Sequence, residues 1–115
     1  MTPFKAFLAI ALLTLGESPG SGQRIPSFDR AVALEGKAET TANASLGDLD
    51  GDGDLDIVLA KGRHWPLVDL VLLNDGKGRF DRRHDLGGKA DRTYTAALAD
   101  LDGDGDLDAV VGNDT

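Results

Sequence analysis

The sequence of 115 residues contains no cysteine, and only 5% of its residues are aromatic. Without cysteine the chain can form no disulfide and carries no lipid-modified cysteine at its N-terminus. Several catalytic motifs are also missing: there is no G-x-S-x-G, no Walker-type or dinucleotide-binding glycine loop, and no pair of histidines at metal-binding spacing. These absences predict a protein that is not an enzyme.

No apolar run in the sequence is long enough for a transmembrane helix. The run Ala6–Leu15 has ten mostly apolar residues, whereas a helix that crosses a bilayer needs about 20. Lys5 precedes this run, and small residues and a proline follow it, which is typical of a signal peptide. We therefore predict that residues 1–22 are a signal peptide, that the mature chain has no membrane span, and that it is secreted or periplasmic/extracellular.

The chain has little positive charge relative to its negative charge, with a formal net charge of −8. Nucleic-acid phosphates require a basic surface, so a nucleic-acid partner is excluded. Ten of the 20 acidic residues lie in two stretches of nine residues. The acidity is therefore concentrated in two places along the chain.

Both stretches read D-L-D-G-D-G-D-L-D, at Asp48–Asp56 and at Asp100–Asp108. Calcium binds about six to eight oxygens, and a loop that offers them at alternate positions can wrap one ion. Positions 1, 3 and 5 would give side-chain oxygens, position 7 a backbone carbonyl, and position 9 a closing carboxylate, while the two glycines permit the sharp turn. A solvated acidic turn without an ion is the alternative, but it fits two identical copies less well. The cofactor is thus predicted to be Ca²⁺, and the predicted ligands are Asp48, Asp50, Asp52, Asp54, Asp56, Asp100, Asp102, Asp104, Asp106 and Asp108.

The residues around these loops exclude an EF-hand. An EF-hand needs a carboxylate at position 12 and a helix after the loop, but position 12 is Leu59 in one copy and Val111 in the other. Each loop runs into a short apolar segment rich in β-branched residues, which favours a strand. The predicted unit is therefore strand, calcium loop, strand.

The chain repeats itself at a shift of 52 residues. Residues 28–60 and 80–112 are identical at 20 of 33 positions without a gap, and a repeat of this size is typical of arrays and propellers. One period is expected to hold four antiparallel strands, at 40–46, 56–60, 68–73 and 79–82, with a hairpin turn at 74–78. The predicted fold class is all-β, built of β-propeller blades. The predicted organisation is a lead-in with a copy of the outer strand (23–39), one full blade (40–82) and a partial second blade (83–115).

These motifs resemble the FG-GAP/VCBS repeat family, whose calcium-loop blades build propellers such as the head of the integrin α-subunit. The resemblance rests on D-L-D-G-D-G-D-L-D-I-V-L-A, on D-L-D-G-D-G-D-L-D-A-V-V-G and on L-L-N-D-G-K-G-R-F between them, and it covers about 27–115. It implies a non-catalytic binding or adhesion module in which calcium stabilises the turns. The alternative is the non-catalytic or substrate-binding part of a larger exported enzyme that acts on polysaccharides. Because fewer than about three such repeats seldom stand alone, the chain is expected to be a fragment whose neighbours are further blades, or the product of a gene that has been cut short.

A second candidate surface is expected at the edge opposite the calcium loops. In an up-and-down blade the connection that carries Arg63, His64 and Trp65 lies on that side, and an arginine and a tryptophan in one loop can anchor an extracellular protein or a carbohydrate. The alternative, also open, is that Trp65 packs between blades.

Overall fold

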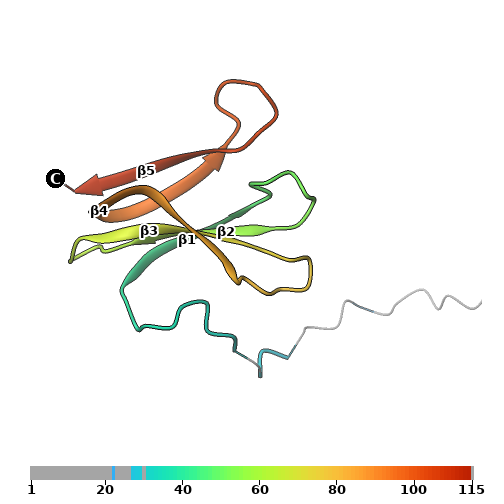
Figure 1. The fold of residues 1–115 in the computed structure, drawn as a ribbon, viewed down its shortest axis with the longest axis horizontal. Coiled ribbons are helices and arrows are strands. Elements are labelled where there is room, and N and C mark those ends of the chain that lie inside the picture. The colour runs from blue at the N-terminus through green and yellow to red at the C-terminus, as the bar shows by residue number, and fades with distance from the viewer. Residues whose placement is uncertain (1–21, 23–26, 30, 115) are drawn as a thin grey trace, which may run out of the picture. The chain divides into compact units, whose positions relative to one another are not determined.

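The structure is a computed structural model that describes residues 22, 27–29 and 31–114 (Figure 1). Apart from Gly22, the predicted signal peptide lies outside these residues. The strands of these described residues lie within the compact unit Ala33–Thr115. Among the described residues there is no helix with the length and apolar character that crossing a membrane requires.

Five antiparallel strands follow one another in the order β1-β2-β3-β4-β5, so each strand pairs with its neighbours in the chain. The first three strands begin and end within one residue of the predicted positions. This confirms an all-β fold built from blade-like units. The strands are β1 Thr41–Gly47, β2 Asp56–Lys61, β3 Leu67–Leu73, β4 Arg82–Ala99 and β5 Asp108–Asp114.

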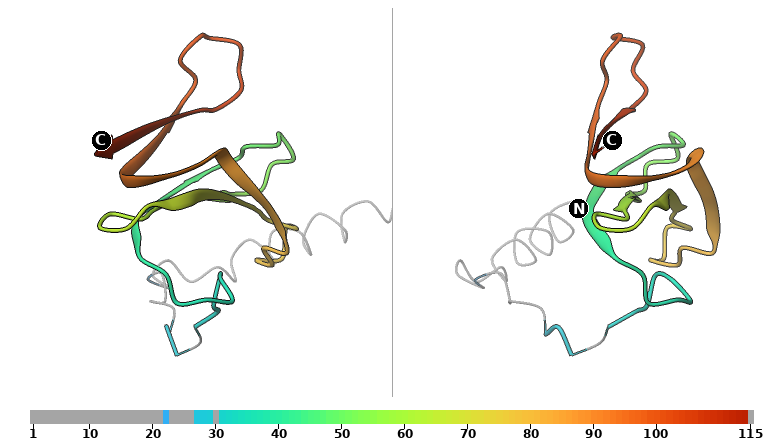
Figure 2. Two further views of the ribbon diagram at one scale, coloured as in Figure 1. Left: turned by 60° about the vertical axis from the view of Figure 1, so that its left-hand side comes forward. Right: turned by 90° about the vertical axis from the view of Figure 1, so that its left-hand side faces the viewer.

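Strand β4 belongs to both repeats, which the sequence prediction missed. Its first part pairs with β3, and its second part, from Arg92 to Ala99, pairs with β5 (Figure 2). The outer strand predicted at 79–82 therefore begins only at Arg82 and continues into the next repeat. Gly87 and Gly88, with φ of 83° and 68°, lie where the register with β3 shifts, so a bulge bends the strand and no separate loop is needed.

The copy of the outer strand predicted within 23–39 is not a strand among the residues that are described there. Leu34 nevertheless packs against the first repeat, beside Ile57 and Leu59 of β2. The segment before β1 thus covers one face of the sheet without joining its hydrogen-bond ladder.

Strand β2 is the centre of the core because it is covered on both faces. Successive side chains of a strand point to opposite faces, and here Ile57 and Leu59 enter one apolar cluster while Val58 and Ala60 enter another. The second cluster also contains Ala96 from β4. The second repeat therefore packs on one face of the first.

Two polar side chains of β1 also hold β4 against the first repeat. Ser45 Oγ on β1 donates to the carbonyl oxygen of Ala96 at 2.6 Å, and the N–H of Ala96 donates to Asn43 Oδ1 at 3.3 Å. Ala96 is opposite Val111 in the ladder between β4 and β5, so the side chains of β1 bind the backbone of the second repeat within its own sheet. The two repeats are held in one register by hydrogen bonds as well as by apolar contact.

A buried lysine ties the segment before β1 to the sheet. Lys61 is 1% exposed, and its ammonium donates to Glu35 and to Glu39. Burial alone would lower the pKa of Lys61, but the hydrogen bonds and charges of the two glutamates outweigh it and raise this pKa above its ordinary value. A buried charge needs such partners, since removing them leaves it uncompensated.

The second repeat is far less buried than the first. Val58 is 0% exposed, whereas Val110, which occupies the same place in the second copy, is 48% exposed. Leu59 and Val111 show the same contrast, at 4% and 38%. Equivalent positions of the two repeats therefore differ in what covers them in the described structure.

This contrast predicts unequal costs for one substitution at two matched positions. Val58→Ala removes buried methyl groups and should lower the free energy of unfolding by roughly 1.5–3 kcal/mol. Val110→Ala should change it by no more than about 0.5 kcal/mol, as is usual for exposed positions. Urea denaturation of both variants measures this, and equal losses would show that the second repeat is covered in solution.

Candidate metal centres

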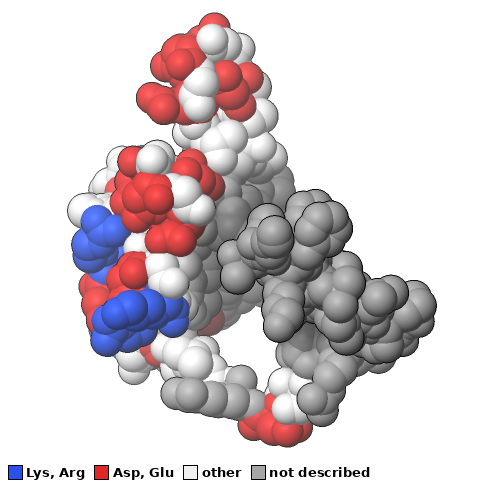
Figure 3. All heavy atoms as spheres, turned by 90° about the vertical axis from the view of Figure 1, so that its right-hand side faces the viewer, with Lys and Arg blue, Asp and Glu red and all other residues white. Residues whose placement is uncertain are grey.

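Both acidic loops lie at the same edge of the fold. One connects β1 to β2 and the other connects β4 to β5, and Figure 3 shows their acidic side chains as two groups on one side of the molecule. The hairpin between β3 and β4 lies at this edge too, because Asn74 Nδ2 donates to the carbonyl oxygen of Leu55 at 3.1 Å. The two acidic loops and the hairpin therefore lie at one edge of the fold.

The first aspartate of each loop closes the turn. Asp48 Oδ1 accepts the N–H of Gly51 at 2.8 Å and of Asp52 at 3.1 Å, and Asp48 Oδ2 accepts that of Gly53 at 2.9 Å. Gly51 and Gly53 have φ of 75° and 91°, the left-handed region that only glycine enters without steric cost. Asp100 accepts the equivalent three amides in the second loop. The loop shape thus follows from its own sequence.

Three of the five carboxylates of each loop converge. In the first loop Asp48, Asp50 and Asp56 each offer an oxygen, and these oxygens lie within 4.8 Å of one another. The same is true of the second loop, whose converging residues are Asp100, Asp102 and Asp108. Positions 1, 3 and 9 are therefore brought together in both copies.

The side chains at positions 5 and 7 do not join these groups. Asp52 Oδ1 instead accepts the N–H of Asp54 at 3.0 Å, and Asp104 Oδ1 accepts that of Asp106 at 2.9 Å. The side chain of Asp54 lies against the hairpin: a Cβ added to Gly76 would stand 2.6 Å from Asp54 Oδ2. A contribution from position 7 through its backbone carbonyl remains a prediction, as does the side-chain role of position 5.

Asp56 ends the first loop and is completely buried. Its Oδ2 accepts the N–H of Leu49 and its Oδ1 accepts the N–H of Asn74, both at 2.8 Å. Asp108 accepts the N–H of Leu101 at 2.9 Å in the equivalent way. Within the described residues no N–H donates to Asp108 from a third strand. The first loop is therefore locked to the hairpin, and the second is held by its own backbone.

Asn74 organises the hairpin as well as the loop, a role that the sequence prediction did not give it. Its Oδ1 accepts the N–H of Gly76 and of Gly78, both at 3.0 Å. Asp75 next to it accepts a hydrogen bond from Arg79 Nε at 2.6 Å. The Arg79 guanidinium lowers the pKa of Asp75 to about 2. Asn-Asp-Gly predicts a turn, but not that Asn74 would reach the neighbouring loop.

The connection that carries the second candidate surface is a tight turn at the opposite edge. The N–H of Arg63 donates to the carbonyl oxygen of Thr93 at 3.3 Å, and Arg63 has a φ of 27°. Glycine at position 62 lets β4 come this close to the turn, because a Cβ there would stand only 2.6 Å from the carbonyl oxygen of Asp91 in β4. Trp65 is 71% exposed, so it does not pack between the two described repeats. His64 is also exposed.

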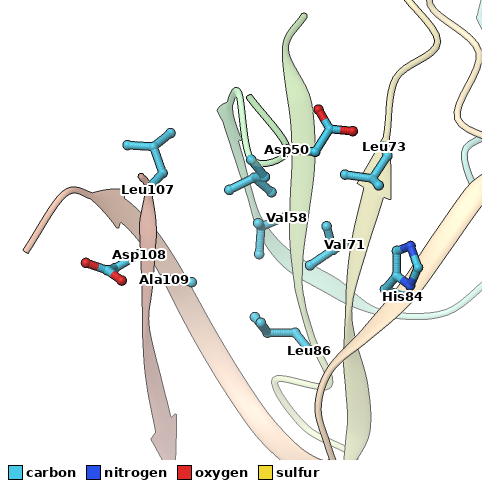
Figure 4. A pocket seen from close by; sticks show the side chains of 10 residues that line it. Asp50, Val58, Val71, Leu73, His84, Leu86, Leu107, Asp108 and Ala109 are labelled. Carbon is cyan, nitrogen blue, oxygen red and sulfur yellow. The ribbon is translucent and has the colours of Figure 1, made fainter. Parts of the chain in front are cut away.

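A hollow of about 420 Å³ lies between the two repeats (Figure 4). Val58, Val71 and Leu86 line it from the first repeat, and Leu107 and Ala109 line it from the second. Asp50, Asp108 and His84 also line it, so each acidic loop contributes one carboxylate. The hollow is part of the packing between the repeats and lies beside the acidic loops.

Short antiparallel sheets that repeat along a chain and pack face to face define a repeat module of the blade type. A family model described as FG-GAP-like repeat matches residues 48–111, which is more than half of the sequence. The chain therefore belongs to the FG-GAP-like repeat family. Repeats of this family are generally non-catalytic and often bind calcium. No curated protein and no solved structure matches the chain.

The contacts of Asp56 predict that the two closing aspartates stabilise the fold unequally without metal. In a chelator, Asp56→Ala leaves two backbone N–H groups without an acceptor and should cost roughly 2–4 kcal/mol of unfolding free energy. Asp108→Ala leaves one N–H near solvent and should cost about 1 kcal/mol or less. Denaturation in chelator measures both, and equal costs would contradict the locking of the first loop by Asn74.

The Asp75–Arg79 pair predicts a pH effect with a definite sign. The pKa of Asp75 is about 2, below its ordinary value of 3.8, so the pair stabilises the hairpin above pH 4 and this contribution is lost as the pH falls towards 2. In Arg79→Met the pKa of Asp75 should return towards 3.8. Carboxylate chemical shifts followed by NMR during acid titration test this, and an unchanged pKa in the variant would contradict it.

Proposed function

We propose that the chain is a secreted or periplasmic calcium-stabilised repeat module that serves binding or adhesion and has no catalytic role. The observation that carries the proposal is the convergence of three carboxylates in each of two identical loops. Each group is made of oxygen atoms alone, which suits calcium and other hard cations and does not suit zinc or copper. The donor set therefore fits the ion that the family often binds.

The converging aspartates of the first site would have different roles. Asp48 shapes the loop through three amides, while Asp50 is the converging residue to which no backbone N–H donates among the described residues. A carboxylate oxygen has two lone pairs, so one that accepts an N–H can still bind a cation. A bound calcium ion would offset the repulsion among these carboxylates. The second site would use Asp100, Asp102 and Asp108, although Asp102 Oδ1 also accepts the N–H of Asp104 at 3.1 Å.

The binding surface is proposed at the opposite edge, at Arg63, His64 and Trp65. The Gly62–Trp65 turn is fixed to β4, so it would present an exposed indole and a cation without much loss of entropy. Such a pair suits a carbohydrate or an extracellular protein. A polysaccharide partner would agree with the second candidate function, a non-catalytic or substrate-binding part of a larger exported enzyme, and the exposed indole of Trp65 would give it a stacking surface.

Further blades are proposed as neighbours of the second repeat. Val110 and Val111 are exposed on β5, whereas the matching residues of β2 are buried. A blade that repeats the contact between the two described repeats would cover Val110, the counterpart of Val58, whose cluster contains Ala96 of the second repeat. Blades of repeat proteins bury their apolar faces against one another in this way.

Removing one converging carboxylate tests the metal role. Calcium at millimolar concentration should raise the melting temperature of the 115-residue chain over that in chelator, because it binds the folded state. Asp50→Asn should remove a large part of this rise. Asp85→Asn is the matched control: it removes the same charge from an exposed position of β4 and should leave the rise intact.

Three results would count against the calcium role. They are an equal melting temperature in calcium and in chelator, an effect of Asp85→Asn as large as that of Asp50→Asn, and an equal rise with potassium. Either of the last two would indicate general charge screening in place of a defined site.

A further inference from the structure

The two acidic loops have the same nine residues but different surroundings. Arg82, the first residue of β4, lies beside the first loop, and its Nη2 donates to Asp50 Oδ2 at 3.2 Å. Asp52 Oδ2 lies 4.0 Å from the same nitrogen. A resident cation therefore contacts one of the converging carboxylates of the first loop.

The described residues place no such cation beside the second loop. Within the described part of the chain, no lysine or arginine nitrogen lies within 4.0 Å of a carboxylate between Asp100 and Asp108. The sequence of the loop cannot account for this difference, because the loops are identical. The two copies thus provide an internal comparison of one loop with and without an arginine.

Arg82 also joins the loop to the hairpin. The same Nη2 that reaches Asp50 lies 3.3 Å from the carbonyl oxygen of Asn74. Asn74 in turn donates its N–H to Asp56, the closing aspartate of the loop. Arg82 consequently holds the loop from its third position while Asn74 holds it from its ninth.

A cation in this place has two opposite effects. Without metal it offsets the repulsion among the clustered carboxylates and stabilises the loop. When a divalent cation binds, the guanidinium repels it and occupies an oxygen of Asp50. The side chain of Arg82 is 56% exposed and that of Asp50 is 27% exposed, so both effects are moderate and depend on salt.

We propose that Arg82 is a positioning residue that acts as a built-in counter-cation of the first loop: it stabilises this loop without calcium and lowers its affinity for calcium, whereas no described residue acts on the second loop in this way. The inference rests on the proposed calcium role of the loops and adds a difference between them. It implies that replacing one residue outside the loops changes one site and leaves the other as it was.

The test isolates each loop in turn. In Asp102→Asn only the first loop keeps its converging carboxylates, and in Asp50→Asn only the second does. Arg82→Met is added to each background. Arg83→Met is the matched control, because it removes the same charge one residue away, where the side chain of a strand points to the opposite face.

Titration calorimetry with calcium should give a clear pattern. In the Asp102→Asn background, Arg82→Met should tighten binding by roughly twofold to fivefold, the range of an exposed ion pair, and raised salt should reduce this gain. Arg83→Met should change the affinity much less. In the Asp50→Asn background, neither substitution should matter. In chelator, Arg82→Met should lower the melting temperature of the otherwise unaltered chain, and Arg83→Met should not.

The outcomes separate this inference from the proposed function. Equal effects of Arg82→Met and Arg83→Met, weaker binding in Arg82→Met, or no effect of Arg82→Met on either affinity or calcium-free stability would overturn the role of Arg82 while the calcium sites stand. Absence of calcium uptake in both single-loop backgrounds would overturn the calcium sites themselves, and the affinity effect with them.

Discussion

The structure depends on how the mutual repulsion of the carboxylates in its two acidic loops is offset. Five aspartates in nine residues can lie together only if donors or cations face them. Backbone amides meet part of this need, since Asp48 and Asp100 each accept three. In the first loop Arg82 meets another part, and the proposed calcium ions would meet the rest. The turns from β1 to β2 and from β4 to β5 are stable only to the extent that this is achieved.

The loops matter to the whole fold because each leads directly into a central strand. Asp56 is the last residue of the first loop and the first of β2, the strand with both faces buried. Its two oxygens hold backbone groups from the start of the loop and from the hairpin. Whatever stabilises the loop therefore also fixes the register of the strand that forms the core. The second repeat then packs on this core through Ala96, whose backbone N–H and carbonyl oxygen bind Asn43 and Ser45.

Local features of this fold could be predicted from the sequence, while contacts between distant residues could not. The period of 52 residues and the apolar strands gave β1, β2 and β3 within one residue, because both signals are local in the chain. The continuity of β4 was missed because Gly87 and Gly88 indicate a turn, although a bulge also uses glycine. The contacts of Arg82 with Asp50 and of Lys61 with Glu35 join residues 32 and 26 positions apart, and no local pattern marks such pairs. The convergence of positions 1, 3 and 9, by contrast, follows from the turn that the two glycines of each loop impose.

The stoichiometry of bound calcium tests the central claim most directly. Native mass spectrometry of the 115-residue chain, combined with equilibrium dialysis at millimolar calcium, counts the ions that the folded protein retains. The account predicts two calcium ions per chain and one ion when either Asp50 or Asp102 is replaced by asparagine. A chain that folds and retains no calcium, or one whose bound calcium is unaffected by both substitutions, would contradict it.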